Sequence, residues 1–185
     1  LGHLDPRIRR AAFRALVQVE GPSVDLFART VIDFDLRNRA IITAELRTLP
    51  WEERGKILLA MARDPEAMDF FGQADTAQTS ARILLEAFGL AAHGDEERLF
   101  AALLETGMSG DALLPFAWRL HPTSSLLWLS NYALDAGNDL PRRRAAIDAI
   151  AFQSTSAAAD SMVALAHAGP EDTRGHAAWW ARSNS

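Results

Sequence analysis

The chain has 185 residues, of which 49% are apolar and 23% charged, with a formal net charge of −5 and no cysteine. The absence of cysteine excludes disulfides, thiol nucleophiles, cysteine-bound zinc and a CxxCH haem attachment within this chain. No apolar run approaches the roughly 18–20 residues of a membrane span, and residues 48–111 hold 5 basic against 12 acidic side chains, so we expect neither membrane insertion nor nucleic-acid binding.

The first predicted helix runs from about Asp5 to Val19, in a chain whose 34 alanines favour helix over sheet. Asp5 is a good N-cap, Pro6 suits the first helical position, and Gly21 ends the pattern. The helical spacing predicts an inward apolar stripe consisting of Ile8, Ala12, Leu16 (or Ala15) and Val19.

Further helices follow in chain order, separated by short polar or Pro/Gly breaks. We predict them over about 23–34, 36–49, 50–63, 76–92, 95–105, 111–120, 124–134, 139–151, 156–167 and 170–182, with a less regular stretch between 65 and 75. The inward residues predicted for them include Phe27, Ile42, Leu58, Ile83, Phe88, Phe100, Leu104, Phe116, Leu129, Leu134, Ile147, Met162 and Ala177. Many short helices with short connections favour a solenoid of antiparallel pairs over a closed bundle.

An internal repeat supports this architecture. Residues 5–16 align without gaps on residues 139–150, and six of the twelve positions are identical: one Asp, two Arg and three Ala. The offset corresponds to four units of about 33–34 residues, the size of one helix pair with its turns. The paired alanines, Ala12 and Ala146 among them, would let this helix approach a neighbour closely.

The shared pattern D-x-x-x-R-x-A-A-Φ-x-A-Φ resembles the HEAT and PBS-lyase-type HEAT-like repeats. That resemblance implies an all-α, right-handed solenoid of about five to six antiparallel helix pairs, formed by residues 1–185 as one array. The segment from Leu140 to Asn184 is also similar to the HEAT region of multidomain dehydrogenase and c-type cytochrome proteins of planctomycete-type bacteria. The chain starts at Leu1, and we expect it to be a segment of a longer protein, periplasmic if this narrower resemblance holds and otherwise cytoplasmic.

No catalytic or metal-binding constellation is predicted. The five histidines form neither an HExxH motif nor an i, i+4 pair. The carboxylate clusters at Glu52-Glu53 and at Asp95-Glu96-Glu97 begin predicted helices, where acidic residues favour the helix dipole. We therefore expect no enzyme activity and no cofactor.

The leading hypothesis is a non-catalytic interaction or scaffold module that docks a protein partner or a neighbouring domain. The alternatives are an accessory domain of a redox or tetrapyrrole-associated enzyme and, less favoured because of the acidic centre, a HEAT-like DNA glycosylase. The interaction candidates are Trp179, Trp128, Tyr132, Arg142 and Arg143. Aromatic residues anchor interfaces, although they also fill cores, and the arginines could instead pair with acids of adjacent repeats.

The two adjacent tryptophans of the last predicted helix cannot both face the same core, because successive residues lie about 100° apart around a helix. Trp180 continues the inward stripe from Ala177. We therefore expect Trp179 to be the more exposed of the two and to contact a neighbouring domain.

Overall fold

The computed structural model describes residues 2–33, 35–64 and 79–183, and within these ranges every regular element is helical. The predicted less regular stretch at 65–75 lies outside the described residues, as does Phe34 at the end of one predicted helix. The chain divides into two compact units, Leu1–Asp95 and Glu96–Ser185.

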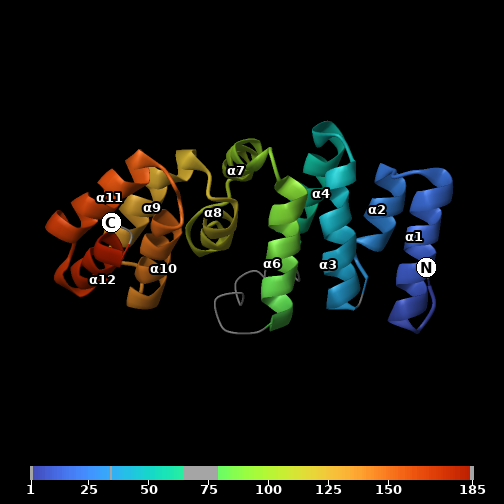
Figure 1. The fold of residues 1–185 in the computed structure, drawn as a ribbon, viewed down its shortest axis with the longest axis horizontal. Helices are drawn as coiled ribbons and strands as arrows, with labels where there is room; N and C mark the ends of the chain where they lie inside the picture. Colours follow the sequence, from blue (N-terminus) through green and yellow to red (C-terminus); the bar gives the residue numbers. More distant parts are fainter. Residues whose placement is uncertain (1, 34, 65–78, 184–185) are drawn as a thin grey trace. The chain divides into compact units, whose positions relative to one another are not determined.

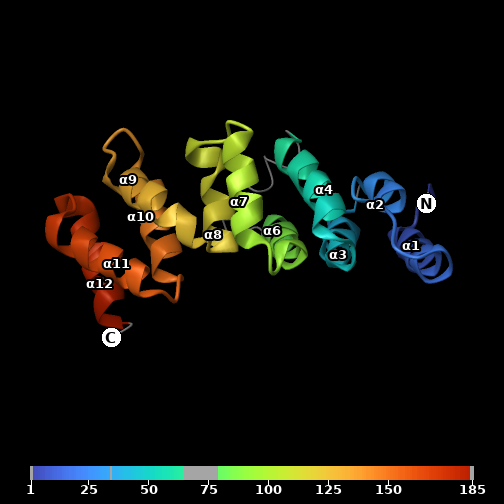
Figure 2. The same ribbon diagram turned by 90° about the horizontal axis from the view of Figure 1, so that it is seen from above.

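The first unit arranges its helices in two rows (Figures 1 and 2). Its elements are α1 (Pro6–Glu20), α2 (Val24–Thr30), α3 (Leu36–Glu45), the 3₁₀ turn η1 (Leu46–Thr48), α4 (Trp51–Arg63) and α6 (Thr79–Ala92). α3 packs along α6, and α2 contacts both α3 and α4. Figure 2 shows α1, α3 and α6 in one row, with α2 and α4 in the other.

The second unit repeats this alternation. Its elements are α7 (Glu96–Glu105), η2 (Gly110–Ala112), α8 (Leu114–Leu120), η3 (Thr123–Ser125), α9 (Leu126–Leu134), α10 (Leu140–Ala151), α11 (Ser156–Ala168) and α12 (Glu171–Ser183). α10 packs against α8 and α12 as well as against its chain neighbours α9 and α11, and α9 also contacts α11. Alternate helices therefore share a layer, with α8, α10 and α12 in one.

Five helices begin at side-chain N-caps of the kind predicted for Asp5. The side-chain oxygens of Asp5, Ser23, Asp35, Asp139 and Thr155 each accept a hydrogen bond from a backbone N–H in the first turn of the helix that follows. Such caps satisfy backbone donors that would otherwise lack an intrahelical partner. α1 ends at Gly21, whose φ of 81° is one that glycine adopts without steric cost.

The inward stripe predicted for α1 is wrong. Phe13 is the buried residue of this helix, and its ring meets that of Phe27 edge-on at a centroid distance of 5.4 Å. Ile8 and Val19 are 48% and 84% exposed. Phe13 lies about 140° around the axis from Ile8, so packing the large aromatic ring turns Ile8 and Val19 outward. Ala12 and Leu16, in the middle of the predicted stripe, are half-buried.

Most other inward predictions are confirmed. The confirmed residues are Phe27, Ile42, Leu58, Phe88, Phe100, Phe116, Leu129, Ile147, Met162 and Ala177, all of them buried. The exceptions are Ile83, Leu104 and Leu134, which are exposed. Each of these three sits one residue from a buried neighbour, which places it at the edge of the apolar stripe. None of the helices described is long and apolar enough to cross a membrane.

Candidate interaction surface

Arg143, one of the predicted interaction residues, is buried at the start of α10. Its Nε donates to the carbonyl of Ala133 at 2.9 Å, and its two terminal nitrogens donate to the carboxylate of Asp172 at 2.8 and 3.1 Å. A bidentate arginine–carboxylate pair of this kind is among the stronger polar contacts in proteins. The structure thus gives Arg143 an internal role, joining α10 to the first turn of α12.

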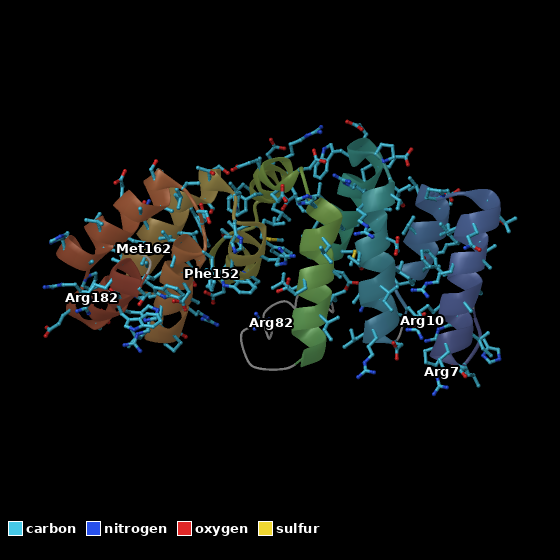
Figure 3. All side chains as sticks on the ribbon, viewed as in Figure 1. Arg7, Arg10, Arg82, Phe152, Met162 and Arg182 are labelled. Carbon is cyan, nitrogen blue, oxygen red and sulfur yellow. The ribbon has the colours of Figure 1, made fainter. Side chains whose placement is uncertain are left out.

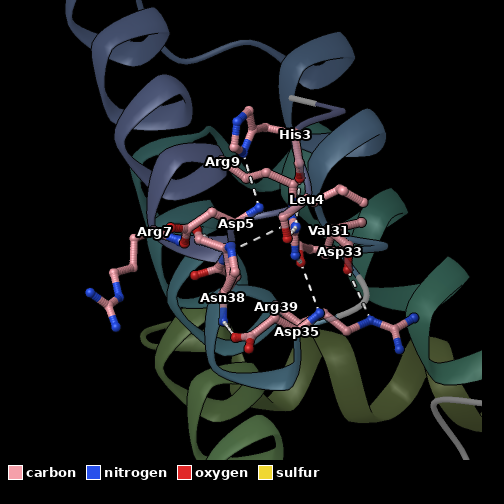
Figure 4. Close-up of polar contacts among 11 residues, drawn as sticks. His3, Leu4, Asp5, Arg7, Arg9, Val31, Asp33, Asp35, Asn38 and Arg39 are labelled. Atoms are coloured by element: carbon pink, nitrogen blue, oxygen red, sulfur yellow. Dashed lines mark hydrogen bonds and ion pairs between the residues drawn. The ribbon is translucent and has the colours of Figure 1, made fainter.

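The repeat-equivalent arginine of α1 makes the equivalent contact. Arg9 donates to both carboxylate oxygens of Asp33, at 2.8 and 2.6 Å, in the segment that follows α2 (Figure 4). This pairing lowers the pKa of Asp33, with the hydrogen bond from Arg9 as the largest cause. Asn38 adds a bond to the carbonyl of Pro6 at 2.7 Å, which joins the start of α3 to the start of α1.

Two further arginines occupy the same position, four residues after the N-cap, in helices outside the internal repeat of residues 5–16 and 139–150. Arg39 in α3 donates to the carbonyl of Val31 and lies 3.6 Å from a carboxylate oxygen of Asp64. Arg54 in α4 pairs with Asp95. In each case the acid lies at the end of the next described helix or just after it. Arg9, Arg39, Arg54 and Arg143 are called the N4 arginines below.

Tyr132 is also internal. It is 6% exposed, its hydroxyl donates to Asp111, and its ring lies 5.2 Å from that of Trp128 between centroids. Burial, followed by the hydrogen bond to Asp111, raises the pKa of the Tyr132 hydroxyl. Arg142 pairs with the other carboxylate oxygen of Asp111 at 2.6 Å while remaining about half exposed. Of these candidates Arg142 remains at the surface and Trp128 is half-buried.

A continuous row of aromatic rings crosses the α8, α10 and α12 layer of the second unit. Ring centroids lie 6.3 Å apart between Trp118 and Phe152, 5.4 Å between Phe152 and Trp180, and 4.9 Å between Trp180 and Trp179. His121 stacks on Phe152, and His176 stacks on Trp179, at 6.2 and 6.4 Å. We call these six residues the aromatic row; Figure 3 labels Phe152 at its centre.

Trp179, Phe152 and His121 are the exposed members of the row, the first two at 54% and 50%, whereas Trp180 is half-buried. The expectation that Trp179 is the more exposed tryptophan is therefore confirmed. Sequence reasoning missed Phe152, Trp118, His121 and His176. Trp118, His121 and Phe152 lie at or just after the ends of α8 and α10, and His176 lies within α12, so these residues share no periodicity along the sequence.

Asp148 holds one end of the row in place. Its Oδ1 accepts from the indole Nε1 of Trp180 at 2.6 Å and lies 2.6 Å from Nε2 of His176. One carboxylate oxygen thus orients two rings of α12 from α10. Because these side chains are held by contacts within the protein, they lose little further freedom when a partner covers them.

At the other end of the row, His121 adopts a left-handed backbone conformation with a φ of 48°, immediately after α8. This conformation carries a steric cost for residues with a Cβ and is usually taken by glycine or asparagine. Here it turns the chain and places the imidazole against Phe152.

In the part of the chain that the structure describes, no three histidine, aspartate or glutamate side chains gather as a metal site requires. Comparison with protein-family models, with curated proteins and with solved structures gives no match.

Proposed function

We propose that this chain is a non-catalytic interaction module, a HEAT-like right-handed solenoid of antiparallel helix pairs, and that the aromatic row docks its protein partner or a neighbouring domain. The observation that carries the proposal is the row itself. It joins six rings from three segments, three of the rings are exposed, and Asp148 orients two of the six.

The chemistry of the row favours a protein partner. Tryptophan and phenylalanine are enriched where interfaces are fully desolvated, and tryptophan is the residue most enriched among binding hot spots. The row also offers polar groups at its edge, since Asp148 and His176 are half-buried. An apolar centre with a polar margin is the usual anatomy of a protein interface.

Two features support the solenoid. Within each unit alternate helices contact each other as well as their chain neighbours, as stacked helix pairs require. The N4 arginines repeat one kind of contact in both units, from the start of one helix to an acid that follows the end of the next described helix.

The proposal is tested by affinity capture from the source cell extract with immobilised wild-type chain and a Phe152→Ser/Trp179→Ser variant. Leu127→Ser is the matched control, because Leu127 is 74% exposed on α9, outside the row. We expect proteins that bind the wild type and the control but not the double variant. If all three chains captured the same proteins, the aromatic row would not take part in the interaction.

A further inference from the structure

Exposed and half-buried rings alternate along the aromatic row. Trp118 is half-buried, and its ring meets those of His121 and Phe152 at interplanar angles of 74° and 83°. Trp180 is also half-buried, and its ring meets those of Phe152 and Trp179 at 66° and 72°. Each half-buried indole thus lies between two exposed rings and is steeply inclined to both. We call these two arrangements the first notch, at Trp118, and the second notch, at Trp180; they share Phe152.

The spacing of the two notches matches one turn of a polyproline II helix. The Phe152 ring lies 6.3 Å from that of Trp118 and 5.4 Å from that of Trp180, so the two indoles are no more than about 12 Å apart. In a polyproline II segment, residues i and i+3 lie on the same side about 9 Å apart, and the two residues between them point away. Two prolines of a P-x-x-P segment would therefore lie over the two notches, with Phe152 in the gap between them.

The shape of the row disfavours a helical partner. A helix docks by laying a continuous apolar stripe into a groove, and it is about 10 Å wide. Phe152 is 50% exposed between two half-buried rings, so it forms a ridge at the centre of the surface. A helix lying on this ridge would be held away from the indoles on both sides. An extended segment avoids the ridge, because its side chains on one face are separated by gaps.

The polar groups of the row favour a neutral partner over a cationic one. The Asp148 carboxylate, which contacts the row, already accepts from Trp180 and lies against His176. Two of the six rings are imidazoles, which gain positive charge as the pH falls. A polyproline II segment carries no such charge, and its carbonyls have no internal partner. In the part of the chain that the structure describes, no hydrogen bond uses the indole N–H of Trp179, so this group can donate to such a carbonyl.

We propose that the partner segment docked by the aromatic row is an extended, proline-rich P-x-x-P segment, with one proline over each notch. This inference rests on the proposed docking function of the row and adds the chemical class of its partner. The pyrrolidine rings pack on the indoles of Trp118 and Trp180, and Phe152 sets the spacing between them.

Titration of the isotope-labelled chain with decaproline, followed by NMR, tests the proposal. The five tryptophans give five indole N–H signals, each assigned by replacing one tryptophan with Phe. We expect the signals of Trp118 and Trp180 to shift together along one binding curve. Those of Trp51 and Trp128, which lie outside the row, should not move.

Substitution of the shared ring provides the matched comparison. Phe152→Ser should weaken decaproline binding about tenfold, because it removes the ridge between the two prolines. Phe152→Tyr keeps the ring and should bind as the wild type does. Leu127→Ser, at an exposed position on α9, should also leave binding unchanged.

Three results would overturn the proline-rich class. They are the absence of shifts at Trp118 and Trp180 at millimolar decaproline, equal affinity of the wild type and Phe152→Ser, and tighter Phe152-dependent binding of a leucine-rich amphipathic helical peptide or of tetramethylammonium. Any of them, combined with row-dependent capture of proteins from the extract, would leave the docking function standing. Capture that does not depend on the row, with decaproline still bound at both notches, would instead contradict the docking function alone.

Discussion

Tyr132 is the only tyrosine of the chain, so its ionisation can be followed without interference from another phenol. Burial and the hydrogen bond to Asp111 raise its pKa, which disfavours the phenolate. A spectrophotometric titration at 295 nm should therefore place the Tyr132 midpoint well above the ordinary value of 10. Because the folded-state pKa is raised, its contribution to stability is present below pH 10 and is lost as the pH rises further.

Asp111→Asn is the informative variant for this titration. It removes a negative charge beside the phenol and should lower the midpoint, while the burial contribution remains. A midpoint near 10 in the wild type would contradict the buried environment of Tyr132.

Trp179 and Trp180 are neighbours in sequence with different environments. Trp179→Ser removes a side chain that is 54% exposed and should change the free energy of unfolding by no more than about 0.5 kcal/mol. Trp180→Ser removes a half-buried ring and leaves Asp148 without its indole donor, which should cost about 3 kcal/mol. Urea denaturation of both variants measures the difference. Equal losses would mean that α12 has no distinct inner and outer faces.

The candidate residues could be selected from the sequence, but apart from that of Trp179 their exposure could not be predicted. Arg142 and Arg143 are adjacent arginines, and only the positions of Asp111 and Asp172 in space decide that the first stays at the surface and the second is buried. The aromatic row was missed for the same reason. Trp118 and Phe152 are 34 residues apart, and their contact depends on α8 and α10 sharing a layer.

The contact between the starts of α1 and α3 should depend on pH. Arg9 holds the pKa of Asp33 below its ordinary value of 3.8, so the charged carboxylate stabilises the fold above that pH. This stability is lost as the pH falls through the lowered pKa. Asp33→Asn should melt at a lower temperature than the wild type at pH 7, and the difference should shrink below about pH 4. Asp160→Asn, at an exposed position, serves as the control. A difference that stays constant with pH would contradict this role for Asp33.

The two helices of the internal repeat provide a matched pair of substitutions. Ala149→Asp in α10 places a charge at a fully buried position and should cost about 3–5 kcal/mol. Ala15→Asp, at the equivalent but exposed position of α1, should cost roughly 0.5 kcal/mol or less. Thermal melts at low protein concentration compare the two. Similar losses would show that the face of α1 that carries Ala15 is covered in the monomer.

The presence of the helices and most of the positions at which they start could be predicted from the sequence, because capping residues and Pro/Gly breaks act locally. Asp5, Asp35 and Asp139 mark their helices through bonds to nearby backbone N–H groups. The orientation of α1 could not be predicted in this way. A helix with apolar residues on two faces has two possible inward stripes, and the position of Phe27 on the next helix selects the face that carries Phe13.

At the scale of the whole molecule, the all-α class was predictable from the alanine content and the spacing of apolar residues. The single array over residues 1–185 and the HEAT-like family stay predictions. They rest on the residue pattern, whereas the contacts describe two units separately. The contacts between alternate helices within each unit agree with the residue repeat found in the sequence. Both the contacts and the repeat are those of helix pairs of similar length.

The spacing of the N4 arginines and their acids bears on the order in which the chain folds. Arg9 meets Asp33 24 residues later, and Arg143 meets Asp172 29 residues later. Closing loops of this size costs little more entropy than closing shorter ones, and such local contacts accompany fast folding. A chain emerging from the ribosome can therefore complete each ion pair as soon as the next helix has been made. Each helix pair can close during synthesis, without waiting for distant parts of its unit.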